Sequence, residues 1–227
     1  MSLLLLASIL ATSAMPAQAA ASDCTGYYYF ADGKRIETTT LDDKGAVKSR
    51  KTMTVRAGRV TPRAAQATLT TRTLDARGEA STATSEARCE NGDLLLDLTS
   101  SLPAQKDPMS SRRAVLLRYP AAMRVGQPLE ARVDFDLDGQ AKGKAMKVNF
   151  SLADRRVADS TAIDTPDGRK TAFVIRSTLN VSFRIIGIAI PMRYDLAEYF
   201  VPGLGVMRTE AEQRGKVVER STVRFAD

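Results

Sequence analysis

Turn signals recur at short intervals along the chain after residue 22. Each places glycine next to a small, polar or charged residue, as at Asp32-Gly33, Asn91-Gly92 and Asp167-Gly168. The runs between them are rich in Thr, Val, Ile, Tyr and Phe, which favour β-strands, so the pattern predicts a meander of antiparallel hairpins. The other signals are Asp43-Lys44-Gly45, Ala57-Gly58, Arg77-Gly78, Asp138-Gly139 and Arg214-Gly215, and strands are expected at 27–30, 34–41, 46–57, 66–75, 79–89, 93–98, 114–119, 130–137, 142–152, 171–183, 185–199, 205–213 and 216–225.

Apolar residues alternate with polar ones in some of these strands and run almost continuously in others. Val133, Phe135 and Leu137 alternate with aspartates, which indicates a strand with one buried face. The run from Phe183 to Ile190 indicates a strand that is buried on both faces or lines a cavity. The mixture predicts an all-β fold, a single antiparallel, strongly curved sheet that closes into a barrel or half-barrel. The ligand-pocket candidates in its interior are Phe173, Phe183, Ile185, Ile188, Ile190 and Tyr199.

The first 21 residues resemble a signal peptide. An apolar run from Leu3 to Ala11 precedes Ala17-Gln18-Ala19, whose small residues suit a signal peptidase. The run is shorter than the about 20 apolar residues of a membrane span, and Asp23 before Cys24 does not suit a lipoprotein anchor. Because residues 1–23 carry no Lys or Arg, the true start is expected to lie upstream. We expect a signal peptide over 1–21 and a single periplasmic β domain over 22–227; the alternative is a disordered tail on a cytoplasmic protein.

The sequence contains two cysteines, Cys24 and Cys89. In an oxidising compartment an even number of cysteines is most simply explained by a disulfide, and no C-x-x-C redox motif is present. A bridge that closes a loop of about 65 residues stabilises a fold by about 4 kcal/mol on the chain-entropy model. We therefore expect a structural Cys24–Cys89 disulfide that fixes the first segment of the mature chain.

The chain has no histidine and no tryptophan. It therefore lacks the commonest general base and zinc ligand, and Ser-His-Asp and Cys-His catalysis are excluded. No nucleophile elbow, S-x-x-K, P-loop or G-x-G-x-x-G motif occurs. Two carboxylates on distant strands could still form a hydrolase site, although sugar hydrolases lean on aromatic platforms that are scarce here. The sequence favours a protein that is not an enzyme and uses no cofactor.

Alternating aspartates at Asp134, Asp136 and Asp138 are followed by Gly139, as in the first half of a calcium loop. The closing acid of such a loop would fall on Ala145. A hairpin is the favoured interpretation, with a turn over 138–140 that places Asp136 opposite Lys142 and Asp134 opposite Lys144. We therefore predict no metal site.

Net charge is +7, and the segment from Gly45 to Leu74 has seven basic residues and no acid. Binding of single-stranded nucleic acid is not expected, because no aromatic side chains interleave with the basic ones. The segment is either an ordinary solvated face or a contact for anionic envelope components such as lipid headgroups. The candidates for anionic-surface contact are Lys48, Arg50, Lys51, Arg56, Arg59 and Arg63.

The segment from Glu198 to Arg208, which contains Pro202-Gly203-Leu204-Gly205, resembles a motif of the TapB-like group of uncharacterised exported bacterial proteins. Similar matches follow the same order along the chain: Cys24 before Tyr27 to Phe30, Cys89-Glu90-Asn91-Gly92, Val125 to Leu129, and Thr165 to Gly168. The resemblance implies an exported, barrel-like antiparallel protein with a disulfide and no known activity. Tyr199 and Ile36 stand where that group usually has tryptophan. Independently, Pro202, Gly203 and Gly205 suit a tight structural turn between two long strands.

The favoured functional hypothesis is a non-enzymatic periplasmic protein that binds an apolar or amphipathic envelope molecule inside the curved sheet, with peripheral membrane contact through its basic residues. The alternative is an interaction or scaffold module with a packed core and no ligand. A carboxylate-based hydrolase is the remote third hypothesis. A pocket of several hundred Å³ lined by residues 173–190 would favour the first.

Overall fold

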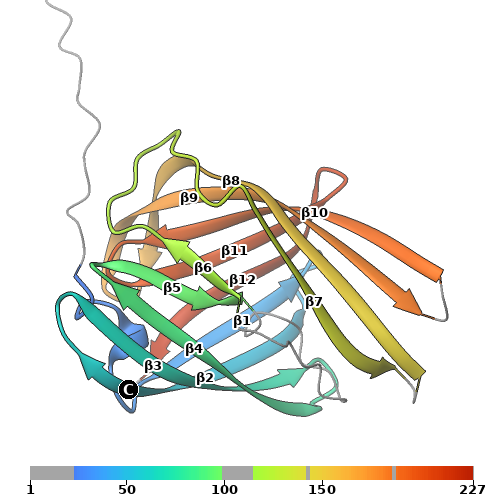
Figure 1. Cartoon of the computed structure of the whole chain (residues 1–227), viewed down its shortest axis with the longest axis horizontal. Coiled ribbons are helices and arrows are strands. Elements are labelled where there is room, and N and C mark those ends of the chain that lie inside the picture. The colour runs from blue at the N-terminus through green and yellow to red at the C-terminus, as the bar shows by residue number, and fades with distance from the viewer. Residues whose placement is uncertain (1–22, 99–114, 142–143, 186–187, 227) are drawn as a thin grey trace, which may run out of the picture.

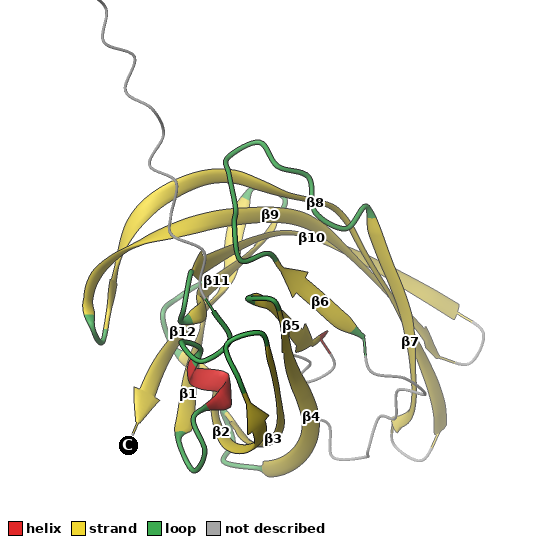
Figure 2. Cartoon of the chain, turned by 60° about the vertical axis from the view of Figure 1, so that its left-hand side comes forward, coloured by secondary structure: helices red, strands yellow, loops and turns green. Residues whose placement is uncertain are grey.

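The computed structural model describes residues 23–98, 115–141, 144–185 and 188–226; the predicted signal peptide lies outside them. These residues form one antiparallel sheet of twelve strands in the order β6-β5-β4-β3-β2-β1-β12-β11-β10-β9-β8-β7. The sheet curls into a half-barrel (Figure 1), in which β8, β9 and β10 arch over β5 and β6 (Figure 2). The prediction of a single, strongly curved antiparallel sheet is confirmed.

The strands follow the predicted hairpins closely, and the described residues contain no helix long and apolar enough to cross a membrane. The elements are η1 (Tyr28–Phe30), β1 (Arg35–Asp42), β2 (Val47–Val60), β3 (Ala64–Asp75), β4 (Ala80–Glu90), β5 (Asp93–Asp97), β6 (Leu116–Tyr119), β7 (Arg132–Ala141), β8 (Lys144–Thr165), β9 (Gly168–Ile185), β10 (Ile188–Val201), β11 (Gly205–Gln213) and β12 (Lys216–Ala226).

The strand expected at 27–30 is wrong: residues Tyr28–Phe30 form a 3-10 turn, η1. The Phe30 N–H donates to the Tyr27 carbonyl at 3.1 Å, which tightens the chain. Tyr27, Tyr29 and Phe30 are all buried. A strand would have sent Tyr28 and Phe30 to one face and Tyr27 and Tyr29 to the other, so a turn buries more of this aromatic run.

Two of the predicted turns are also wrong. Ala57-Gly58 lies inside β2, where the register against β3 shifts between Ala57 and Val60. A Cβ at Gly58 would lie 3.2 Å from the Gln66 carbonyl oxygen, so glycine here allows a β-bulge with close backbone contact. Asp138-Gly139 lies inside β7, which continues to Ala141. The weakly patterned segment Ala153–Ile163 is part of the long strand β8.

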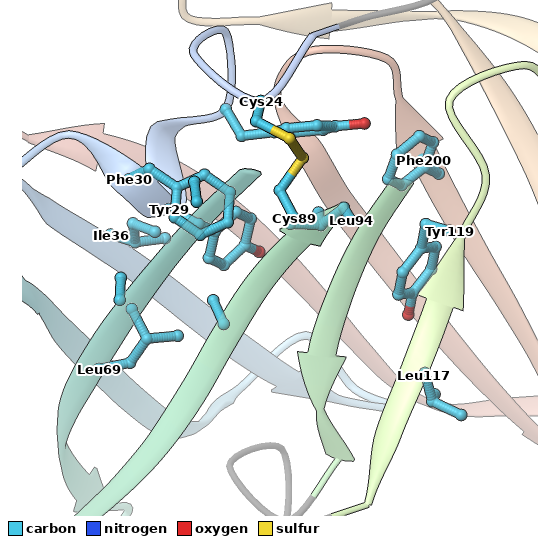
Figure 3. Close-up of a cluster of buried hydrophobic side chains, with 14 of the residues drawn as sticks. Cys24, Tyr29, Phe30, Ile36, Leu69, Cys89, Leu94, Leu117, Tyr119 and Phe200 are labelled. Atoms are coloured by element: carbon cyan, nitrogen blue, oxygen red, sulfur yellow. A yellow bond between two sulfur atoms is a disulfide. The ribbon is translucent and has the colours of Figure 1, made fainter. Parts of the chain in front are cut away.

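The main core fills one end of the half-barrel, called here the cap end (Figure 3). Cys24 and Cys89 form the predicted disulfide, with their Cα atoms 5.6 Å apart. The Tyr119 and Phe200 rings stack with their centroids 5.1 Å apart, which joins edge strand β6 to β10. Burial of this cluster ties the first mature residues to strands that lie far away in the sequence.

The predicted turn at Pro202, Gly203 and Gly205 is confirmed as the corner between β10 and β11. The Leu204 N–H donates to the Val201 carbonyl at 3.0 Å. Gly205 has a φ of +107°, and a Cβ there would lie 2.5 Å from Cε2 of Tyr29. Only glycine therefore fits at this position, both for its backbone conformation and for its contact with η1.

Candidate functional site

The far ends of β7–β10 project from the cap end as one four-stranded unit, seen on the right of Figure 1. We call it the arm and define it as residues 132–141, 144–152, 178–185 and 188–195. Its strands are in continuous antiparallel register, so residues that face one another across all four strands form rows. Because side chains alternate between faces, each row belongs to one face of the sheet.

The inner face of the arm, which continues the inner face of the half-barrel, is apolar. One row runs Leu137, Val148, Phe183, Ile190 across the four strands. Met146, Val148 and Val181 form a second core cluster that continues the main core, because Leu179 packs against both. The Phe135 and Phe150 rings add a stacked pair with centroids 4.7 Å apart.

Exposure of this face increases towards β10. Val148 is completely buried, whereas Ile190 is 51% exposed and Ile188 is 69% exposed. Two exposed isoleucines on a face shared with Phe183 and Met192 differ from the single exposed apolar side chains that are common on protein surfaces. We call the apolar surface formed by Phe183, Ile188, Ile190 and Met192 the inner β10 surface.

The structure brings together only part of the predicted pocket. Phe183 and Ile190 are cross-strand partners. Ile188 pairs with Ile185, whose side chain lies outside the described part of the chain. Phe173 is buried in the main core. Tyr199 lies in a third cluster, and its hydroxyl donates to Glu210 at 3.2 Å.

A buried ionic network lies on the inner face next to the main core, and sequence analysis missed it. The Arg155 guanidinium, in a residue that is 2% exposed, donates to Glu130 at 2.6 Å and to Glu198 at 3.4 Å. The Tyr119 hydroxyl donates to Glu198 at 2.7 Å. The guanidinium also lies 4.4 Å from the centre of the Tyr119 ring. The network therefore fastens β6 to β8 and β10.

A bulge turns Arg155 inward. The β8–β9 register shifts between Ala153 and Arg156, and Asp154 has a φ of +57°. The Leu129 N–H donates to the Arg155 carbonyl at 2.9 Å, so the segment before β7 pairs locally with this part of β8. The sequence does not predict this bulge, because an aspartate at position 154 is also typical of an ordinary exposed strand position.

Burial changes the protonation equilibria of this network. Desolvation raises the pKa of the Tyr119 hydroxyl well above its usual value, and the charge of Glu198 adds to the rise. Burial and Glu198 raise the pKa of Tyr29 as well. Desolvation opposes the charge on Arg155, but Tyr119, Glu198 and Glu130 outweigh it and raise the pKa of the guanidinium. The arrangement is a neutral-tyrosine, charged-arginine cluster at ordinary pH.

The basic segment does not form one patch. Val55 is buried in the main core, so alternation along β2 turns Lys51 inward and Arg50 and Arg56 outward. Burial lowers the pKa of Lys51. Lys48 forms an ion pair with Glu219. Besides Lys48, the exposed members of the predicted anionic-surface set are Arg50, Arg56, Arg59 and Arg63.

The acidic hairpin exists, but its predicted register is wrong. Asp136 lies opposite Asn149, and Asp134 lies opposite Ser151. Residues 138–140 are paired within β7 instead of forming the turn, and Lys144 lies opposite Ala141, not opposite Asp134; Lys142 lies outside the described residues. Lys147 pairs with Asp136 at 3.0 Å. Within the described ranges, no three or more Cys, Asp or Glu side chains are arranged to hold a metal ion.

Comparison with known families adds to this geometry. A family model described as DUF3108-like matches residues 31–223. The chain belongs to the DUF3108-like family. No curated protein matches its sequence.

Two solved structures share the fold of this DUF3108-like protein. One, from Bacteroides fragilis NCTC 9343, is assigned as an exported protein with a YmcC-like fold; its TM-score is 0.68 at 17% identity, over 86% of this chain and 96% of that one. The other, from Parabacteroides distasonis ATCC 8503, is assigned as a lipoprotein; its TM-score is 0.68 at 15% identity, over 87% and 96%. At these identities the likeness shows the fold alone.

Proposed function

We propose that this protein is a non-enzymatic periplasmic protein that binds an amphipathic envelope molecule with an anionic headgroup. The apolar chain of the ligand would lie on the inner β10 surface, which is continuous with the core but open to solvent at Ile188 and Ile190. This open apolar surface is the observation that carries the proposal, because burying it against a partner is favourable.

Charge supports an anionic ligand over a neutral one. The chain has a net charge of +7. Exposed arginine side chains attract anionic headgroups. Exposed Arg50, Arg56, Arg59 and Arg63 would add a peripheral contact with anionic membrane surfaces.

The resemblance to exported proteins and lipoproteins of the same fold supports the periplasmic location, as does the signal-peptide pattern over 1–21. Membership of the TapB-like group remains a finer prediction within the DUF3108-like family. The packed cap end, in contrast, favours a structural role for that half of the sheet. Ligand binding is therefore proposed for the arm alone.

Titration with lysophosphatidylglycerol and lysophosphatidylcholine, followed by native mass spectrometry, tests this proposal. We expect the anionic lipid to bind more tightly. Ile188→Ser/Ile190→Ser should weaken binding at least about tenfold, because two partly exposed isoleucines lose their contact with the apolar chain. Val125→Ser is the matched control, since Val125 is 52% exposed outside the arm.

Two results would refute the proposal: no lipid adduct of the wild type, or equal binding by wild type and the double isoleucine variant. Retention of a partner protein, instead of a lipid, by protein purified from its own periplasm would favour the scaffold alternative.

A further inference from the structure

The outer face of the arm carries a groove of about 540 Å³ whose chemistry is opposite to that of the inner face. Two cross-strand rows make its surface. Three apolar residues of the groove, Phe150, Val181 and Met192, lie between these rows in sequence, so their side chains alternate to the inner face. The rows are Asp134, Ser151, Asn180, Arg193 and Asp136, Asn149, Ser182, Pro191, with Arg132 at one end.

Side-chain length explains why this face is hollow. The two central strands, β8 and β9, contribute only serine and asparagine to the rows. The flanking strands contribute Asp134, Asp136 and the ring of Pro191, together with the longer Arg132 and Arg193. Short side chains in the middle and long ones at the margins leave a trough across the twisted sheet. A trough of this volume lies within the usual range of ligand sites.

One wall of the groove is fixed by its own contacts. Nε of Arg132 donates to both carboxylate oxygens of Asp134, at 2.9 and 2.8 Å. The Asn149 amide and Lys147 hold Asp136. Hydrogen bonds from Arg132 lower the pKa of Asp134, and those from Lys147 and Asn149 lower the pKa of Asp136. Both carboxylates are therefore ionised acceptors in a preorganised wall.

The floor of the groove, formed by the central strands β8 and β9, differs from this wall, because two of its polar side chains make no hydrogen bond to the described residues. Asn180 and Ser182 form no side-chain hydrogen bond to any of the described residues. Asn180 presents two donors and a carbonyl acceptor, and Ser182 presents a hydroxyl that can do either. The groove thus has ready acceptors on one side, free donors and acceptors on its floor, and the Arg193 guanidinium at the other side.

We infer that this groove binds an extended saccharide chain. Sugar hydroxyls each donate and accept, so they match a surface that alternates carboxylates, amides, hydroxyls and guanidinium groups. The C–H face of a sugar can pack against the Pro191 ring. An extended peptide is a poorer fit, because the floor strands β8 and β9 are paired on both sides and expose no strand edge to it.

The groove has no aromatic platform, so the affinity per sugar unit would be low. We therefore expect recognition of a chain, not of a single sugar. The inference is independent of the proposed lipid function, since groove side chains and inner β10 side chains lie on opposite faces of the same strands.

Amide chemical shifts of the isotope-labelled full mature chain test the inference. The probes are chitohexaose and maltohexaose, with N-acetylglucosamine and glucose as their respective monomers and a Gly-Ser repeat peptide of matched length. At least one hexasaccharide should shift the amides of Asn149, Ser151, Asn180 and Ser182, and its monomer should not do so at the same concentration of sugar units.

The variant Asn180→Ala/Ser182→Ala should weaken this binding by roughly fivefold for each hydrogen bond lost. Arg169→Ala/Thr171→Ala, at exposed positions at the other end of β9, is the control and should bind like the wild type. The spectra themselves report whether each variant is folded. Arg193→Ala, on the opposite wall, should also weaken binding.

Three results would overturn the inference: no groove shift with either hexasaccharide, unchanged affinity in the Asn180→Ala/Ser182→Ala variant, or equal groove shifts with the peptide. Each leaves the lipid experiment intact, because Ile188 and Ile190 are not part of this groove.

Discussion

Replacement of Arg155 by methionine should be among the most destabilising single changes in the protein. The Arg155 side chain is 1% exposed and its partner Glu198 is 14% exposed. Without the guanidinium, the contact that Glu198 keeps among the described residues is the hydrogen bond from the Tyr119 hydroxyl, which does not neutralise its charge. Removing one member of a buried ion pair typically costs 3–5 kcal/mol, because the other charge remains buried. Because Glu198 keeps its hydrogen bond from Tyr119, we expect a loss at the lower end of this range, about 3 kcal/mol.

For a domain of this size that loss corresponds to a decrease in Tm of about 6–12 °C. Far-UV circular dichroism in urea is the suitable assay, since the chain has no tryptophan. The second variant, Arg155→Met/Glu198→Gln, removes the more buried of the two carboxylates that pair with Arg155 and should recover at least about 1 kcal/mol. Arg132→Met is the control: its side chain is 65% exposed beside Asp134, so the change should stay within about 0.5 kcal/mol. A double variant as unstable as Arg155→Met would refute the reasoning.

Three further predictions concern the cap end. The pKa of Tyr29 and Tyr119 is raised by burial, so the folded state keeps protons that the unfolded chain releases above about pH 10; the free energy of unfolding should be unaffected below that pH and decrease above it. Tyr119→Phe should reduce by about one the number of protons released on unfolding above that pH, which urea melts measure as the slope of unfolding free energy against pH. An unchanged slope would contradict this prediction. Cys24→Ser/Cys89→Ser opens a loop with a sequence separation of 65 and should cost about 4 kcal/mol; free thiols in the native protein would refute the bridge. Gly205→Ala should cost about 2 kcal/mol or more, and Gly203→Ala less, because only at Gly205 would a Cβ meet Tyr29; equal losses would exclude that contact.

Local signals predicted the strands well because turn residues and alternation act over a few residues. They failed where glycine has two uses: Ala57-Gly58 and Asp138-Gly139 could each be a turn or lie within a strand, and only pairing with the neighbouring strand decides. They also failed at Tyr28–Phe30, where a short apolar run fits a strand or a buried turn equally well. In each case tertiary contacts determine whether the segment is a strand or a turn, and the local sequence does not show those contacts.

The candidate sites divide in the same way. The apolar run from Phe183 to Ile190 was visible in the sequence, but the expectation of a strand buried on both faces is wrong: the run is divided between β9 and β10, and Ile188 and Ile190 are exposed. The outer groove was visible in principle, since Val148-Asn149-Phe150-Ser151-Leu152 and Leu179-Asn180-Val181-Ser182-Phe183 both alternate apolar residues with Asn and Ser. Whether these polar residues form one surface depends on the β8–β9 register, which places the two segments side by side. The Arg155 network depends on a bulge and on partners from three separate segments, so no local pattern could have shown it.

The division of the arm into two faces limits what its function can be. One face of the arm exposes isoleucines, whereas the other presents a groove with short polar side chains on its floor. A single layer of strands separates the two faces, so a molecule on one face cannot fill the other. Two ligands of different chemistry can therefore be held about one sheet thickness apart. An apolar chain on the inner face and a sugar chain on the outer face would each satisfy groups that the fold itself leaves without partners. Disrupting one should leave the other at full affinity, because neighbouring residues such as Ile190 and Pro191 serve opposite faces.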